Sequence, residues 1–221
     1  MDVKKEYMAK AALGKKSRYK AMAIVAIVAL VTAVGIFLMI YNLFEGKTLF
    51  CIGYLAASIL GIGYIIIEIN SIFATFLAID RKKIYMKNWR NGFVPFNLKH
   101  KVGFIREFIP AGTRILEIKF SDVDRCLLGS SNFLRRYCHT DYDFIEKLNK
   151  FEGLGFISKV HIKRMDYFYI ETRSGESCFM PVTGFDEAEL TKIVIYIEKI
   201  TKIKVRCNNP EVVKRRETLK R

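Results

Sequence analysis

The chain has 221 residues, of which 51% are apolar, and it carries a formal net charge of +15 at neutral pH. The N-terminal 20 residues carry +5 and the apolar part that follows carries −1, so +11 falls on residues 80–221 and predicts anionic partners. Five scattered cysteines without a C-x-x-C pair argue against a disulfide framework, and we expect free thiols. The composition supports one soluble domain beside a membrane part.

Two uncharged apolar runs stand near the N-terminus, at residues 21–44 and 48–67, with Glu45-Gly46-Lys47 between them. At about 1.5 Å of rise per residue, each is long enough as a helix to cross a hydrocarbon core of roughly 30 Å. The runs predict a permanent transmembrane hairpin over residues 21–79, in which residues 69–79 continue the second helix as a stalk.

Basic residues set the expected orientation of this hairpin. Residues 1–20 form a basic arm with seven Lys or Arg, suited to a helix at the lipid headgroups, and residues 81–90 carry five more, whereas the turn has Lys47 alone. Because Lys and Arg favour the cytoplasmic side, both termini are expected in the cytoplasm, with the protein multi-pass in the cell membrane.

Small residues recur every four positions in the second apolar run, at Gly53, Ala57 and Gly61. Such spacing lets helix backbones approach closely in lipid, which favours packing between the two helices of the hairpin over a dimer face. Glu68 is expected at the cytoplasmic headgroups, just past the span.

The pattern changes after the stalk to that of a cytoplasmic domain over residues 80–205. Alternating apolar residues and turn signals predict short antiparallel strands. The expected strands cover residues 84–86, 93–96, 102–109, 116–120, 158–163, 167–172 and 177–182. Asn91-Gly92 is a hairpin turn signal, and Pro95 marks an edge strand or a bulge.

Helices are expected in two places within this domain. A short one over residues 141–151 follows a capping box at Thr140 and Asp143, after a loop at residues 129–131. The clearest one starts at Asp186 and Glu189, which form a second capping box before an apolar stripe. The basic tail, residues 206–221, is expected to be loosely ordered or only transiently helical.

Short strands closed by one C-terminal amphipathic helix follow the element order of a pleckstrin-homology-like (PH-like) barrel, an α+β fold. The segment 115–123 resembles a strand of bacterial PH-like and GRAM-like domains, and segments 167–170 and 179–187 resemble the end of YcxB-like bacterial membrane proteins. That family has two N-terminal transmembrane helices before a cytoplasmic PH-like domain. The resemblance implies the fold and no catalytic residues; this chain differs in its longer middle, residues 127–155.

The candidate site is a basic hairpin close to the membrane. Its cations and aromatic neighbour could bind lipid headgroups or other anions, while the simpler interpretation is topology bias and solvated charge. The residues are Lys82, Lys83, Lys87, Trp89 and Arg90.

Catalytic or metal-binding patterns are weak. Cys138-His139 with Cys126 lacks a second pair at zinc spacing, and Cys178 with His161 is a poor nucleophilic pair. We expect no cofactor, no metal and no enzymatic activity, but a binding or scaffolding module at the anionic inner leaflet, with a homo-oligomer or protein partner as further options. The alternative is an effector whose barrel senses a small anionic ligand and drives assembly of the hairpins. Nucleic acid is a less favoured partner than lipid.

Overall fold

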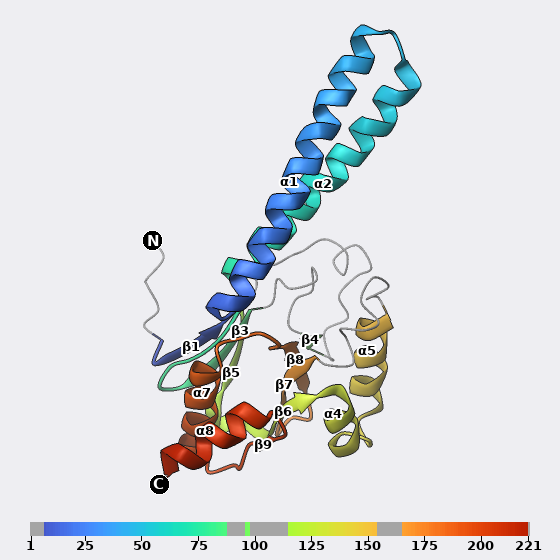
Figure 1. Ribbon diagram of the computed structural model, residues 1–221. Helices are drawn as coiled ribbons and strands as arrows, with labels where there is room; N and C mark the ends of the chain where they lie inside the picture. The colour runs from blue at the N-terminus through green and yellow to red at the C-terminus, as the bar shows by residue number, and fades with distance from the viewer. Residues whose placement is uncertain (1–6, 88–95, 98–114, 154–164, 221) are drawn as a thin grey trace.

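A computed structural model of the chain describes residues 7–87, 96–97, 115–153 and 165–220 (Figure 1). The strands expected at 102–109 and 158–163 and the Asn91-Gly92 turn lie outside the described residues. A long helical hairpin projects from an α+β domain, as Figure 1 shows, and the C-terminus lies at the end of the domain away from that hairpin.

The hairpin consists of α1 (Lys15–Phe44) and α2 (Thr48–Ala74), joined by the expected turn. Both helices are long and apolar enough to span a membrane. Most of their large apolar side chains are exposed, as helices surrounded by lipid would require. The hairpin is therefore confirmed as a pair of antiparallel apolar helices.

The packing of α1 on α2 uses fewer of the expected small residues than the spacing suggested. A Cβ on Gly61 would collide with the Thr32 side chain, so Gly61 does allow the close approach. Gly53 has nothing within 4 Å of an added Cβ, and Ala57 is exposed. Gly53 and Ala57 therefore face away from α1, because the line of contact runs instead through Ser58, which is 4% exposed.

The expected stalk over residues 69–79 is wrong beyond Ala74. Thr75 adopts an extended conformation after α2, and Phe76–Ile79 form strand β2, in which all four side chains are buried. The N-terminal arm is helical only from Lys15, where α1 begins; before it Ala9–Ala12 form strand β1 and pair with β2. Burial on both faces explains β2, because a sheet covered on both sides accepts a continuous apolar run.

The domain contains two sheets. The first has the order β1-β2-β3-β5, is antiparallel, and includes β3 (Lys83–Lys87) and β5 (Leu116–Lys119). The second has the order β4-β8-β7-β6-β9. Its strands are β4 (Phe96–Asn97), β8 (Ser177–Pro181), β7 (Asp166–Thr172), β6 (Val123–Ser130) and β9 (Arg206–Cys207). Within the described ranges these sheets do not close into a barrel; the α+β class is confirmed.

The middle of the chain differs from the expected loop. Residues 129–131 are no loop, because Gly129 lies inside β6 and the chain then enters α4 (Ser131–Tyr137). The next helix, α5 (Tyr142–Gly153), matches the expected one, but Asp141 and not Thr140 caps it, accepting a hydrogen bond from the Phe144 amide at 3.0 Å.

The second sheet is covered on both faces, which explains the inserted helices. One face carries Leu127, Tyr167, Tyr169 and Phe179, which pack under α4 and α5 in a separate cluster with Phe144. The other face joins the main core, which contains α7 (Glu187–Thr201) and the first sheet. The insertion thus supplies the cover for a face that would otherwise expose aromatic rings.

The C-terminal part is more ordered than expected. The Asp186 cap of α7 is confirmed, with its carboxylate accepting from the Ala188 and Glu189 amides. The tail then forms β9 and helix α8 (Pro210–Lys220), in which Val212 is fully buried. Because β9 pairs in parallel with β6, the tail is part of the fold.

Candidate functional site

The point where the hairpin enters the domain is built from two neighbouring strands. Strand β1 precedes α1 and β2 follows α2, and the two pair in antiparallel register with Ala12 opposite Phe76 and Ala9 opposite Ile79. Both ends of the hairpin therefore enter one sheet side by side. We call the Ala12 and Phe76 end of this sheet the hairpin end and the opposite end the far end.

The start of α1 is also fixed to the start of α7. The Gly14 amide donates to the Gly184 carbonyl at 2.9 Å, and the Asp186 amide donates to the Ala12 carbonyl at 2.8 Å. Gly184 has a φ of +78°, and a Cβ there would lie 2.7 Å from the Ser17 hydroxyl oxygen. A glycine is required at this position both by its backbone conformation and by the close approach of α1.

The expected basic site is not gathered into one place. Lys87 lies opposite Phe76 at the hairpin end, whereas Lys82 lies in the turn before β3 and Lys83 begins β3, both at the far end. Lys87 is four residues along β3 from Lys83, or about 13 Å. Trp89 and Arg90 lie outside the described residues.

The far-end turn is held firmly in place. Asp80 Oδ1 accepts from the Lys82 and Lys83 amides at 2.6 and 2.7 Å, and Asp80 Oδ2 accepts from the Tyr85 hydroxyl. Burial would raise the pKa of Asp80, but these hydrogen bonds hold it below its ordinary value. Lys83 Nζ forms an ion pair with Glu117 Oε2 at 2.7 Å, and this pair partly neutralises the positive charge of the lysine.

A different set of cations lies at the hairpin end. The first turns of α1 carry four exposed basic side chains directly before the apolar stretch. These junction cations are Lys15, Lys16, Arg18 and Lys20. Arg18 Nε also donates to the Leu13 carbonyl at 2.7 Å, which ties the group to the end of β1. The positive-inside pattern contained this signal, but the sequence interpretation assigned these residues to topology.

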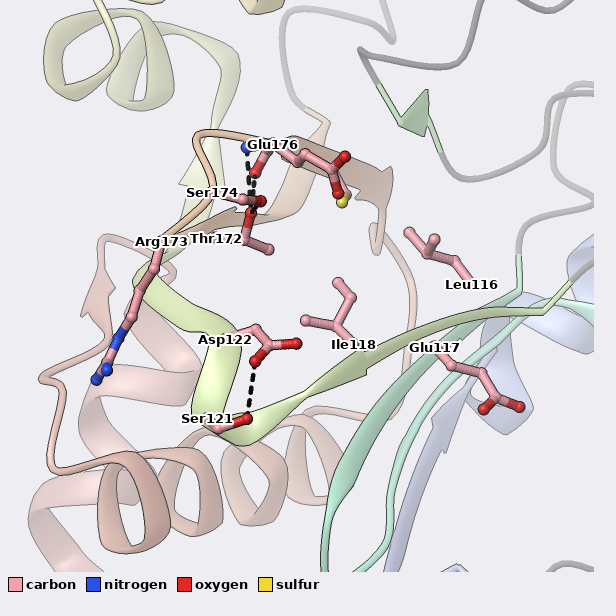
Figure 2. Close-up of a pocket in the computed structure, with 10 residues that line it drawn as sticks. Leu116, Glu117, Ile118, Ser121, Asp122, Thr172, Arg173, Ser174 and Glu176 are labelled. Carbon is pink, nitrogen blue, oxygen red and sulfur yellow. Dashed lines mark hydrogen bonds between the residues drawn. The ribbon is translucent and has the colours of Figure 1, made fainter.

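A cavity of about 610 Å³ opens between the two sheets (Figure 2). One wall is β5 with the short 3₁₀ helix Phe120–Asp122, and the other is the turn between β7 and β8. The lining is rich in oxygen acceptors. It includes Ser121, Asp122, Thr172, Ser174 and Glu176, with Leu116 and Ile118 beside them. The Glu117 carboxylate points away from the cavity in Figure 2 and is paired with Lys83. In Figure 2 the guanidinium of Arg173 points away from Asp122, so the lining favours hydrogen-bond donors and cations over anions.

Four of the five cysteines are buried, and Cys207 is half-buried. All five are free thiols, as expected. Burial raises the pKa of Cys138 to about 11 and that of Cys178 to about 12, which keeps both thiols protonated and poorly nucleophilic. His139 is exposed, and His161 lies outside the described residues. In the described part of the chain, no three His, Cys, Asp or Glu side chains stand close enough to hold a metal.

A buried polar network joins α5 to the second sheet. The Ser177 hydroxyl donates to Asp141 Oδ2 at 2.6 Å, and the Tyr169 hydroxyl lies 3.0 Å from the same oxygen. Burial raises the pKa of Tyr169 far above its ordinary value. The network was not anticipated, because Asp141 and Ser177 are 36 residues apart and nothing local predicts their contact. It positions the inserted helices.

Comparisons of this chain with protein-family models, curated proteins and solved structures gave no match.

Proposed function

We propose that this chain is an integral membrane protein whose cytoplasmic domain acts as a non-enzymatic binding or scaffolding module at the anionic inner leaflet. In this proposal the domain is a PH-like module of YcxB-like membrane proteins, and the junction cations, with Lys87 beside them, contact lipid phosphates. Each exposed Lys or Arg near an anionic surface contributes on the order of 1 kcal/mol.

The observation that supports this proposal is the pairing of β1 with β2 across the base of the hairpin. The two strands continue directly from the two apolar helices, so the domain has no free linker between itself and the hairpin. If α1 and α2 span the bilayer, the junction cations fall at the level of the headgroups, since they directly precede the uncharged part of α1.

The test uses the full chain, because residues 80–221 alone would lack two strands of the first sheet. Resistance to alkaline carbonate extraction tests membrane insertion. The second assay reconstitutes the chain in vesicles with a trace of fluorescent phosphatidylglycerol and measures its enrichment around the protein. We expect enrichment that falls with salt and is lost in a Lys15→Gln, Lys16→Gln, Lys20→Gln triple variant; equal enrichment of phosphatidylcholine would refute headgroup binding.

The second candidate is a membrane effector whose assembly is driven by a small anionic ligand. In its favour, the cavity wall β5 belongs to the same sheet as β1 and β2, and the outward-facing Gly53 and Ala57 leave a small-residue face for a second hairpin. The carboxylates lining the cavity speak against an anion there. Size measurement in detergent with and without a nucleotide tests this candidate: ligand-dependent assembly that is lost in Gly53→Ile would favour it.

A further inference from the structure

Among the described residues of the domain, a group of exposed cations lies at the end opposite the hairpin. Six exposed cations stand on the end of α7, on the segment that leads to β9, on β9 itself and on α8. They are Lys199, Lys202, Lys204, Arg206, Lys214 and Arg215, which we call the far basic surface. Two exposed carboxylates, Glu211 and Glu217, accompany them. This surface is separate from the junction cations.

The direction of α7 shows how far this surface lies from the hairpin. The start of α7 is bonded to the end of β1, at Asp186 and Ala12, while ten residues later the Tyr196 hydroxyl lies 2.9 Å from Met8 Sδ at the start of β1. The helix thus runs away from the hairpin, and its 15 residues advance about 22 Å. Figure 1 shows α8 lying across the lower part of α7, at the end of the domain away from the hairpin.

The surface has a rigid base. Arg216, within the same helix as Lys214, is 15% exposed, forms an ion pair with Glu198 at 3.1 Å and donates to the Val205 carbonyl at 3.0 Å. The Arg206 guanidinium lies 4.8 Å from the centre of the Tyr137 ring, a geometry that holds the side chain while leaving its charge available. The cations of α8 and the Arg206 side chain are therefore held by ordered contacts.

We propose that the far basic surface binds the phosphate backbone of a nucleic acid. If α1 and α2 span the bilayer, as in the proposed function, this surface faces away from the lipid and cannot be explained by contact with the leaflet. Protein interfaces are centred on aromatic and apolar anchors. Among the described residues of this region, the exposed large apolar side chains are two aliphatic ones, Ile200 and Leu219, and none is aromatic. A surface dominated by separated cations fits a regular array of phosphates instead.

The test measures binding of a fluorescein-labelled 24-nucleotide RNA to the full chain in nanodiscs of phosphatidylcholine. We expect binding that weakens steeply with salt, because each neutralised phosphate on a single strand contributes about 0.7 to the slope of log K against log salt. A Lys204→Gln, Lys214→Gln, Arg215→Gln triple variant should lower this slope by about 2 and weaken binding at least tenfold.

The junction triple variant is the matched control, because it removes the same charge from the opposite end and should leave RNA binding unchanged. Equal loss in both variants would mean attraction by net charge alone and would overturn the proposal. So would absence of RNA binding at 50 mM salt, or displacement of the RNA by polyglutamate at equal charge concentration, which would indicate an acidic protein partner.

The two proposals fail separately. If carbonate extracts the chain from membranes and the chain still binds RNA, the membrane proposal is refuted while nucleic-acid binding by the far basic surface is supported. A carbonate-resistant chain that does not bind RNA would refute nucleic-acid binding by the far basic surface and leave the membrane proposal standing.

Discussion

At the scale of single residues, the fold depends on polar groups held away from water at the C-terminal end of the domain. Arg216 and Glu198 form an ion pair in which both side chains are 15% exposed, and Glu198 also accepts from the Val205 amide at 3.0 Å. The pair links α8 to α7. Truncating one partner of such a pair leaves the other with unmet hydrogen-bonding capacity, which costs more than losing a surface pair.

Arg216→Ala is therefore expected to destabilise the domain by about 1–3 kcal/mol. The exposed neighbour gives the control, since Arg215→Ala should change the stability by less than about 0.5 kcal/mol. Thermal unfolding in detergent with a thiol-reactive dye measures both, because Cys126, Cys138 and Cys178 are buried until the domain opens. Equal melting temperatures for the two variants would show that the ion pair contributes nothing.

Asp166 provides a pH-dependent test at the same scale. Burial raises the pKa of its carboxyl above the ordinary 3.8, and the Asn209 amide, which donates to Asp166 Oδ2 at 2.6 Å, only partly offsets this. The folded chain thus holds this proton more tightly than the unfolded chain, so the carboxyl favours folding at low pH. This contribution is lost as the pH rises from 3.8 through the raised folded pKa.

Asp166→Asn should consequently be more stable than the natural chain at pH 7, and the difference should shrink toward pH 4. The asparagine keeps an oxygen that can accept from Asn209, so the hydrogen bond survives while the ionisation penalty disappears. Melting curves of both proteins across pH 4–7 measure the difference. A variant that is less stable at pH 7 would mean that the ionised carboxylate is the favoured partner of Asn209.

At the scale of elements, the contact between the starts of α1 and α7 depends on Gly184. An alanine at this position has two free-energy costs, one from the positive φ and one from the close contact of its Cβ with Ser17. Gly175 has almost the same φ, +76°, with nothing within 4 Å of an added Cβ. Gly175→Ala should therefore report the backbone cost alone, about 1–2 kcal/mol.

Gly184→Ala is expected to cost clearly more than Gly175→Ala, and the excess should fall when Ser17→Ala is added to it. Gly14→Ala is a further control, since its Cβ would meet neighbours at ordinary distances of 3.6 Å or more. The thiol-dye melting assay again supplies the free energies. An equal cost at residues 184 and 175 would show that α1 yields easily at the junction.

The elements that the sequence predicted are those with a complete local signal. The alternation at residues 116–120 and the Asp186 cap with its apolar stripe needed no distant partner to be recognised. Strands β1 and β2 had the opposite character: Ala9–Ala12 is rich in a helix former, and Phe76–Ile79 continues an apolar helix without a breaker. Their conformation follows from their pairing with each other. The whole hairpin lies between them in the sequence, so a pattern of neighbouring residues cannot predict this pairing.

The spatial arrangement of the candidate cations could not be predicted from the sequence for the same reason. Lys82, Lys83 and Lys87 are close in sequence. Lys82 and Lys83 lie at the start of β3 and Lys87 at its end, so the extended strand places them at opposite ends of the first sheet. Which end lies near the hairpin is decided by the register of β1 on β2. Residues 206–221 were expected to form a loose tail, because the burial of Val212 against the core cannot be predicted from a helix of low amphipathicity.

At the scale of the whole molecule, the membrane proposal makes one geometric demand: the α1–α2 turn and the domain must lie on opposite sides of the bilayer. Lys47 lies in that turn and Lys82 at the far end of the domain, and both are exposed. The natural cysteines interfere little, since four are buried and Cys207 is half-buried. Lys47→Cys should be labelled by a membrane-impermeant maleimide on intact cells, whereas Lys82→Cys should be labelled only after permeabilisation. Labelling of residue 82 on intact cells would reverse the topology, place the junction cations at the outer leaflet, and remove the cytoplasm as the source of a partner for the far basic surface.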